Sequence, residues 1–316
     1  MNYRKSRIEY YRERTFSEKL NVTFDFIREN WKPLLKYTFY LIMPVCLIQT
    51  FAMNSFISAG FSSAGSGGAS SFGRMAGSSA VTFFVNYGVI LFCSLIGAAI
   101  ISGMVYAMMQ AYATREDGLG HVTLNDFKEN LVRNIWKCLR ISLFFILICI
   151  VITGIAAILA VLVSAVSLFI TIPILIIALL LLIPFMMLMP VYIFEHDIRF
   201  PDAITKAWKL GTETLWGMLG LFIVLSIVSS VVQTLTTLPW YIVTLFGHVL
   251  SLTAESTLNQ SAIYKFAVFI LGLIQTYGAY AASTVGLIGL AFHYFHAREK
   301  AEGVTIESNI SNFNRL

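Results

Sequence analysis

Long apolar stretches alternate with charged segments along the whole chain. A helix that crosses a bilayer needs about 20 mostly apolar residues. Five stretches reach that length: Tyr37–Ile57, Val81–Ala113, Ile141–Phe194, Trp216–Leu238 and Phe266–His296. The third contains no charged residue and is long enough for two helices. We place the turn between Ser164 and Pro173, because proline is tolerated in the first turn of a helix. The pattern predicts six transmembrane helices.

One apolar run does not fit this pattern. Pro239–Lys265 separates the last two predicted stretches and contains the apolar run Trp240–Leu250. That run is too short to cross a bilayer on its own. We interpret it as an interfacial or re-entrant segment.

Each pair of predicted spans follows a charged segment with helical periodicity. The three segments are Thr15–Trp31, Thr123–Leu139 and Phe200–Thr214. Their apolar residues recur every three or four positions and so share one face of a helix. These residues are Phe16, Leu20, Phe24, Ile27 and Trp31 in the first segment, Leu124, Phe127, Leu131, Ile135 and Cys138 in the second, and Ile204 and Trp208 in the third.

Helix-start signals open these segments. Thr15 with Glu18, and Thr123 with Asp126, have the spacing of a capping box. In the third segment Pro201 suits the first helical turn. Each segment also ends near a tryptophan, at Trp31, Trp136 and Trp216, and an indole favours the headgroup boundary of a bilayer. We expect three amphipathic helices that lie in the membrane interface, with their apolar stripes toward lipid or toward the bundle, or that serve as stiff connectors.

An amphipathic helix followed by two spans therefore occurs three times. The copies cover residues 15–117, 123–197 and 200–300, and residues 301–316 form a polar tail. The predicted fold is an all-α integral membrane protein, a single membrane domain of six transmembrane helices in three repeats.

Composition and charge placement agree with this class. The chain is 57% hydrophobic and 12% charged, whereas a soluble domain has about 25% charged residues. Of its 22 Lys and Arg residues, all but Arg74 and Lys265 fall on the side of the predicted spans that holds both termini. The positive-inside rule makes that side cytoplasmic. The net charge of +5 is thus explained without nucleic acid as a partner.

Two predicted spans carry stripes of small residues, which let helices approach closely in lipid. One stripe is Ala99, Gly103, Ala107 and Ala111, and the other is Gly278, Ala282 and Gly286. The fourth span instead contains Pro173, Pro184 and Pro190. Prolines bend a helix, either to line a cavity or, as we favour, as a packing accommodation.

The spans offer little chemistry. They contain almost no ionisable residue, and the amides Gln49, Asn86, Gln233 and Gln275 are expected to hydrogen-bond across helices. No GxSxG, HExxH or Walker motif occurs. At the predicted cytoplasmic ends, one set of residues could hold a divalent metal: His293, His296, Glu299, Glu195, His196 and Asp197. Polar residues are also expected wherever a span leaves the membrane, and we favour that interpretation. We predict no catalytic residue, cofactor or metal.

Residues 191–220 read VYIFEHDIRFPDAITKAWKLGTETLWGMLG. They combine a helix end at Glu195, the pattern A-x-x-x-A-W-x-L and an aromatic start to the next span at Trp216. This resembles the membrane domain of some bacterial glycerophosphoryl diester phosphodiesterases and of related uncharacterised six-span inner-membrane proteins, which commonly have serine at the position of Ala207. The resemblance implies a multi-pass protein of the bacterial inner membrane. In those phosphodiesterases a separate soluble barrel performs hydrolysis, so we expect that activity not to carry over.

Three kinds of function fit the sequence. The first is a non-enzymatic membrane module that acts through membrane lipids, or through a partner membrane or cytoplasmic protein, at the cytoplasmic face. The second is a transporter or channel for a neutral or lipid-like substrate, and the third is an intramembrane enzyme. The lack of buried charge and of any catalytic set favours the first.

Overall fold

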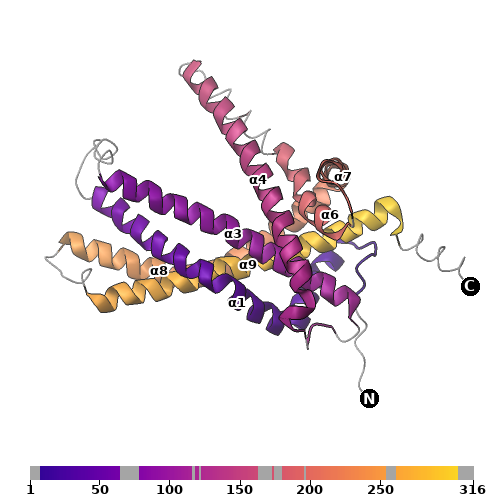
Figure 1. Cartoon of the computed structure of the whole chain (residues 1–316), viewed down its shortest axis with the longest axis horizontal. Coiled ribbons are helices and arrows are strands. Elements are labelled where there is room, and N and C mark those ends of the chain that lie inside the picture. Colours follow the sequence, from indigo (N-terminus) through magenta and orange to yellow (C-terminus); the bar gives the residue numbers. More distant parts are fainter. Residues whose placement is uncertain are drawn as a thin grey trace, which may run out of the picture. The chain divides into compact units, whose positions relative to one another are not determined.

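A computed structural model shows a chain built of helices (Figure 1). It describes residues 8–64, 78–115, 118–120, 122–162, 173, 180–195, 197–253 and 261–304, and no strand occurs in these ranges. The helices are α1 (Phe16–Ala64), α3 (Ser78–Thr114), α4 (Leu124–Leu162), the 3-10 helix η1 (Ile183–Met187), α6 (Leu188–Phe194), α7 (Phe200–Glu213), α8 (Leu215–Thr253) and α9 (Ala262–Glu302).

Five of the described helices, α1, α3, α4, α8 and α9, are long and apolar enough to cross a membrane. This is the make-up of a multi-pass helical membrane protein. The fourth predicted span is represented by a shorter apolar helical stretch, Leu180–Phe194, which includes η1 and α6. The predicted turn between Ser164 and Pro173 lies, apart from Pro173 itself, outside the described residues.

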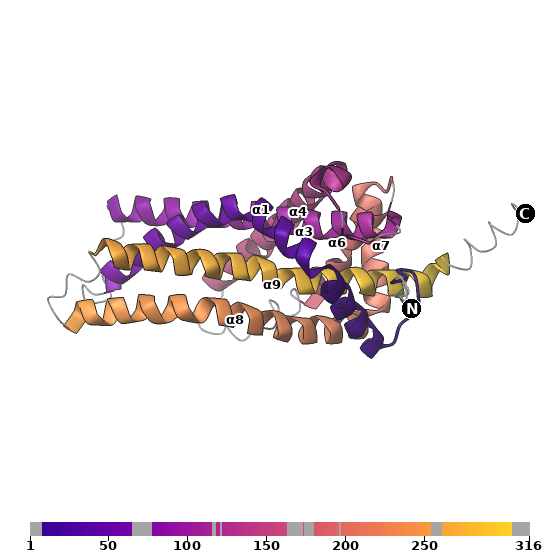
Figure 2. The same cartoon turned by 90° about the horizontal axis from the view of Figure 1, so that it is seen from below.

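The chain divides into two compact units. Unit 1 contains residues 1–33, 102–226 and 285–316, and unit 2 contains residues 34–101 and 227–284. Unit 2 consists of parts of α1, α3, α8 and α9, which run alongside one another (Figures 1 and 2). Hydrogen bonds join its neighbouring helices. Ser229 Oγ of α8 donates to the carbonyl of Ala282 in α9, and the hydroxyls of Thr50 in α1 and Thr276 in α9 are 3.1 Å apart.

In unit 1 the short helices pack closely. A Cβ atom added to Gly211 of α7 would lie 2.3 Å from the carbonyl oxygen of Pro184, so only glycine allows α7 to lie this near η1. At the C-terminal end of α6, the carbonyl oxygens of Tyr192 and Ile193 accept hydrogen bonds from Lys137 and Gln110. These side chains satisfy carbonyl groups that a helix end leaves without partners.

The amphipathic segments form helices where the sequence places them. Both capping boxes are confirmed: the backbone N–H groups of Thr15 and Thr123 donate to Glu18 and Asp126 at 2.7 Å. In the first two segments the helix continues into the following apolar stretch, within α1 and α4. α1 bends at Asn30, whose φ and ψ are −115° and 17°. Pro33 explains the bend, because its ring clashes with the carbonyl one turn earlier.

The small-residue stripes are helix contacts at most of their positions. A Cβ atom on Gly103 would be 2.9 Å from the side chain of Ile135 in α4, and one on Gly278 would be 2.2 Å from Thr236 in α8. Ala282 is buried as well. Gly286 departs from the pattern, since a Cβ atom there would meet no atom within 4 Å.

The interpretation of Trp240–Leu250 as a separate interfacial or re-entrant segment is wrong. α8 continues through this run without a break and ends at Thr253. Pro239 lies inside the helix. A proline costs a helix one backbone hydrogen bond, and neighbouring helices can compensate for it in an apolar setting. Trp240 is buried, and its ring lies close to Gly272 of α9.

Candidate functional site: a buried basic cluster and an ion network

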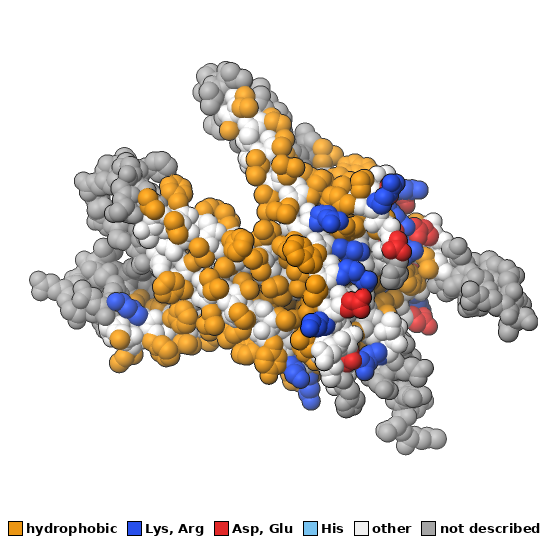
Figure 3. Space-filling view, in the orientation of Figure 1, with side chains coloured by type: hydrophobic (Ala, Val, Ile, Leu, Met, Phe, Trp, Pro, Cys, Tyr) orange, Lys and Arg blue, Asp and Glu red, His pale blue; other side chains and the backbone are white. Residues whose placement is uncertain are grey.

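Charged side chains gather on unit 1, whereas the visible face of unit 2 is mostly hydrophobic (Figure 3). Unit 1 also exposes tryptophan side chains, three of them by half or more. Trp31, Trp136 and Trp216 have exposed fractions of 51%, 69% and 84%. Exposed indoles beside Lys and Arg residues are typical of protein surfaces at the headgroup level of a membrane.

The part of α1 before the bend at Asn30 turns its apolar stripe outward. Phe16 and Phe24 are 42% and 39% exposed, although the sequence places them on its hydrophobic face. The inward face consists of Lys19, Thr23, Phe26 and Asn30, all nearly or fully buried. Thr23 and Asn30 satisfy their side chains by donating to backbone carbonyls one turn earlier.

Lys19 begins a chain of polar contacts among buried and half-buried groups. Its Nζ atom is 3.4 Å from Nδ1 of His293, which is fully buried, and Nε2 of that ring is 3.2 Å from the hydroxyl of Thr214. The Thr214 hydroxyl in turn donates to the carbonyl of Leu210 at 2.7 Å. One consistent assignment has Lys19 donating to a neutral imidazole that donates to Thr214. The chain joins α1, α9 and the junction between α7 and α8.

The segment before α1 packs onto α9. The backbone N–H of Arg14 donates to Nδ1 of His296 at 3.0 Å, and the Arg14 guanidinium donates to backbone carbonyls, including that of Tyr10. Tyr10 stacks on Phe295 with ring centroids 4.8 Å apart and donates to the carbonyl of Met109. Burial lowers the pKa of Arg14, yet a guanidinium remains charged. Arg14, Lys19, His293, His296 and the nearby Lys300 form what we term the basic cluster.

A separate ion network ties α6, α7 and α9 together. Lys206 of α7 pairs with Glu195 at 2.7 Å and with Glu302. Arg298 pairs with Glu302 at 2.8 Å and donates to the hydroxyl of Tyr11. Burial raises the pKa of Tyr11, so its hydroxyl stays protonated. Networks of partly buried charges fix geometry more than they add stability.

Three of the six residues considered for a metal site are used in these contacts. His293 faces Lys19 and Thr214, His296 faces the backbone of Arg14, and Glu195 belongs to the ion network. Asp197 has a positive φ of 58° and lies in the connection before α7. His196 lies outside the described residues. Among the residues that the structure describes, no group of three His, Cys, Asp or Glu side chains could hold a metal ion.

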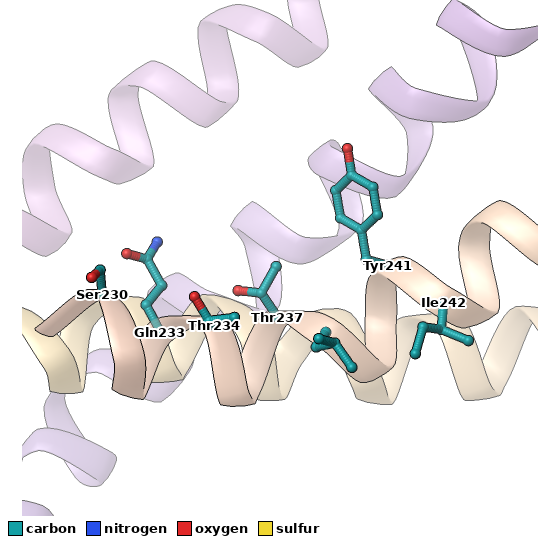
Figure 4. A pocket seen from close by; sticks show the side chains of 7 residues that line it. Ser230, Gln233, Thr234, Thr237, Tyr241 and Ile242 are labelled. Atoms are coloured by element: carbon teal, nitrogen blue, oxygen red, sulfur yellow. The ribbon is translucent and has the colours of Figure 1, made fainter. Parts of the chain in front are cut away.

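Two of the predicted amides differ in role. Gln49 hydrogen-bonds across helices as expected, donating to Ser94 at 3.1 Å and accepting from Tyr280 at 2.7 Å. Gln233 instead lines a hollow of about 520 Å³ in unit 2. Ser230, Gln233 and Thr237 project from the same side of α8 into it (Figure 4).

The other two amides, Asn86 and Gln275, differ from Gln49 in their contacts. Asn86 donates to the carbonyl of Thr82 within its own helix. Gln275 is half-buried in α9 and is not among the described residues that line the hollow.

The motif behind the family resemblance is the buried face of α7. Ala203, Ala207 and Leu210 are almost fully buried, and Trp208 contacts Phe185 of η1 with ring centroids 5.0 Å apart. The motif therefore has a packing role in this structure. Comparison of the chain with family models, curated proteins and solved structures gives no match.

Sequence reasoning missed the residues that carry most of these contacts. Lys19 and Lys206 enter the sequence argument only as basic residues on the predicted cytoplasmic side, and Thr214 only as the end of the third segment. A signal was present in the first segment, where Lys19, Thr23 and Asn30 recur at helical spacing. That polar stripe competes with the apolar stripe for the inward face.

Proposed function

We propose that this chain is a non-enzymatic membrane module of the bacterial inner membrane that acts through lipid or partner-protein contacts at its cytoplasmic face. It has six spans in three repeats, with both termini inside. In this proposal the charged surface of unit 1 faces the cytoplasm. The family resemblance around Ala203 and Ala207 agrees with such a module.

The outward stripe of the first helix supports the proposal most directly. Phe16, Phe24 and Trp31 face outward while Lys19 faces inward. In water this arrangement would expose apolar area and bury a charge, both of which are unfavourable. At a membrane interface the same stripe gains free energy by entering the headgroup and acyl boundary. Trp136 and Trp216 extend the apolar surface over other elements of unit 1.

The test is purification from native membranes with the bound lipids and proteins identified together. A variant carrying Phe16→Gln and Phe24→Gln should lose lipids or partner proteins that the wild type retains. Phe92→Gln is the matched control, since Phe92 is 62% exposed but belongs to unit 2. An unchanged set of bound molecules in the double variant would contradict the role of this face.

The topology has its own test. Reporter fusions after residues 118, 198 and 305 should be cytoplasmic, and those after 70 and 257 should be external. An external signal at 118 or 198 would reject the six-span arrangement.

The hollow on α8 favours a second candidate function, transport of a neutral or lipid-like substrate. Its lining combines the amide and hydroxyls of Gln233, Ser230 and Thr237 with apolar Leu238 and Ile242. If purified protein in liposomes moves a solute, and Gln233→Ala stops this while Gln275→Ala does not, transport replaces the module as the function.

A further inference from the structure

Lys19 carries a buried positive charge that no carboxylate compensates within the described ranges of the chain. The residue is only 5% exposed, and among the described residues its ammonium has a hydrogen-bond contact with Nδ1 of His293, at 3.4 Å. No ion pair involves Lys19 in the part of the chain that the structure describes. The charge of Lys300 acts on Lys19 and has the same sign. Since a buried ammonium is unfavourable without a counter-charge, this arrangement needs an anion to balance it.

The Lys19 ammonium lies over the first turn of α8. A Cβ atom on Gly217 would be 3.6 Å from Nζ of Lys19 and 3.5 Å from the ring of His293. The first turn of a helix has backbone N–H groups without partners and carries the positive end of the helix dipole. A lysine would not be favoured at this end on its own. An oxyanion there would meet the ammonium and the N–H groups together.

Aromatic side chains flank this position on the outward side. Phe16 packs on α8 beside Gly220, where a Cβ atom would be 3.3 Å from its ring, and Phe16 is itself partly exposed. Trp216 precedes Gly217 in the same turn and is almost fully exposed. Apolar rings next to an oxyanion site match a ligand that has both an acyl part and a charged headgroup.

We propose that Lys19 and the first turn of α8 at Gly217 bind the phosphate of an anionic phospholipid headgroup. This inference rests on the proposed function, because it names the lipid chemistry that unit 1 recognises. The ammonium supplies the charge, the backbone N–H groups supply directed donors, and His293 holds the lysine side chain in place. The absence of a side chain at Gly217 lets the phosphate approach the backbone.

The experiment uses the full-length protein in detergent and counts the phospholipids that survive delipidation, by native mass spectrometry. The wild type, supplied with phosphatidylglycerol or phosphatidylcholine, should retain one phosphatidylglycerol. Lys19→Gln should retain it about tenfold less well, as expected when one charge-assisted hydrogen bond is lost. Lys19→Arg should restore retention. Lys32→Gln is the matched control, because it removes the same charge from an exposed position of α1.

A second variant tests the contact between the phosphate and the backbone of α8 without changing the charge of the site. Gly217→Ala places a methyl group at an ordinary contact distance from its neighbours, so the fold is preserved. It should weaken phosphatidylglycerol retention, whereas Gly154→Ala, where an added Cβ meets nothing within 4 Å, should not. Equal retention by the wild type, Lys19→Gln and Gly217→Ala would overturn the site.

Thermal melting separates the lipid from other sources of phosphate. In lipid-free detergent, Lys19→Gln should melt above the wild type, because it removes an uncompensated buried charge. Added phosphatidylglycerol should raise the melting temperature of the wild type and leave that of the variant unchanged. If inorganic phosphate does this and phosphatidylglycerol does not, the lipid assignment is wrong.

Different results would reject the membrane module and the phospholipid site. Solute flux that depends on Gln233, together with lipid retention that depends on Lys19, would reject the module and keep the lipid site.

Discussion

The first helical segment of α1 and the first segment of α4 both belong to unit 1 and bury the same positions counted from the capping threonine, but different residues fill those positions. In α4, Phe127, Leu131 and Cys138 of the apolar stripe are buried. In α1 the matching buried positions hold Lys19, Thr23 and Asn30, whereas Phe16, Phe24 and Trp31 of its apolar stripe are exposed. Each segment starts with a threonine capping box and has one tryptophan near its end. The inward face is therefore the same in both helices, and the apolar stripe lies on that face only in α4.

The comparison shows what hydrophobic periodicity does and does not determine in a membrane protein. A stripe identifies a helix and its two faces. It identifies the inward face only where the outside is water, because lipid also accepts an apolar face. The polar inward face of α1 is possible since Thr23 and Asn30 donate to backbone carbonyls and Lys19 reaches His293.

The variants with the largest expected effect test this comparison directly. Phe127→Ala removes a fully buried ring from α4 and should destabilise the protein by about 3–5 kcal/mol, as large core truncations do. Phe24→Ala removes the same ring from an exposed position of α1 and should change stability by less than about 1 kcal/mol. Thermal or denaturant unfolding in one detergent measures both. Similar losses in the two variants would mean that the stripes face the same way.

A smaller effect is expected where α3 meets the buried face of α4. Gly103→Leu forces a side chain against Ile135, both its side chain and its backbone nitrogen, and overpacking of this kind costs about 1–3 kcal/mol. Gly88→Leu makes the same change in the same helix where no atom lies within 4 Å, so it is the control. The folded yield in mild detergent should fall for Gly103→Leu alone. Equal yields would remove the contact between α3 and the stripe of α4.

Much of the fold follows from the sequence. The apolar stretches, the three amphipathic helices, the capping boxes and the contacts at Gly103 and Gly278 were all predicted from spacing and residue type. These features depend on neighbours in the chain or on the absence of a side chain, which a sequence displays. The prediction failed at Trp240–Leu250, which was treated as a segment of its own because the run is too short to cross a bilayer. The cost of one missing backbone hydrogen bond did not outweigh the continuous apolar face that follows it.

The candidate site was much harder to predict. The contacts of Lys19 with His293, and of Lys206 with Glu195 and Glu302, join residues far apart in sequence. Each residue has an ordinary explanation as a charge near a helix end, so spacing cannot show that they meet. The metal hypothesis grouped His293 with Glu195 because both end apolar helices. Their side chains instead join different networks, since they lie in contact with different basic residues.

The smallest effect tests what the two helices have in common. Thr15→Ala and Thr123→Ala each remove a cap whose hydroxyl and backbone N–H meet an acidic partner three residues later. Loss of such a cap costs about 1 kcal/mol. Because the caps are local and both exposed, the two losses should agree within about 0.5 kcal/mol although different residues fill the inward faces behind them. Thr15→Ser and Thr123→Ser keep the hydroxyl and should restore most of the stability in the same unfolding measurement. A much larger loss of stability in Thr15→Ala would show that the start of α1 depends on its cap more than the start of α4 does. The first segment of α1 would then have less packing to hold it in place.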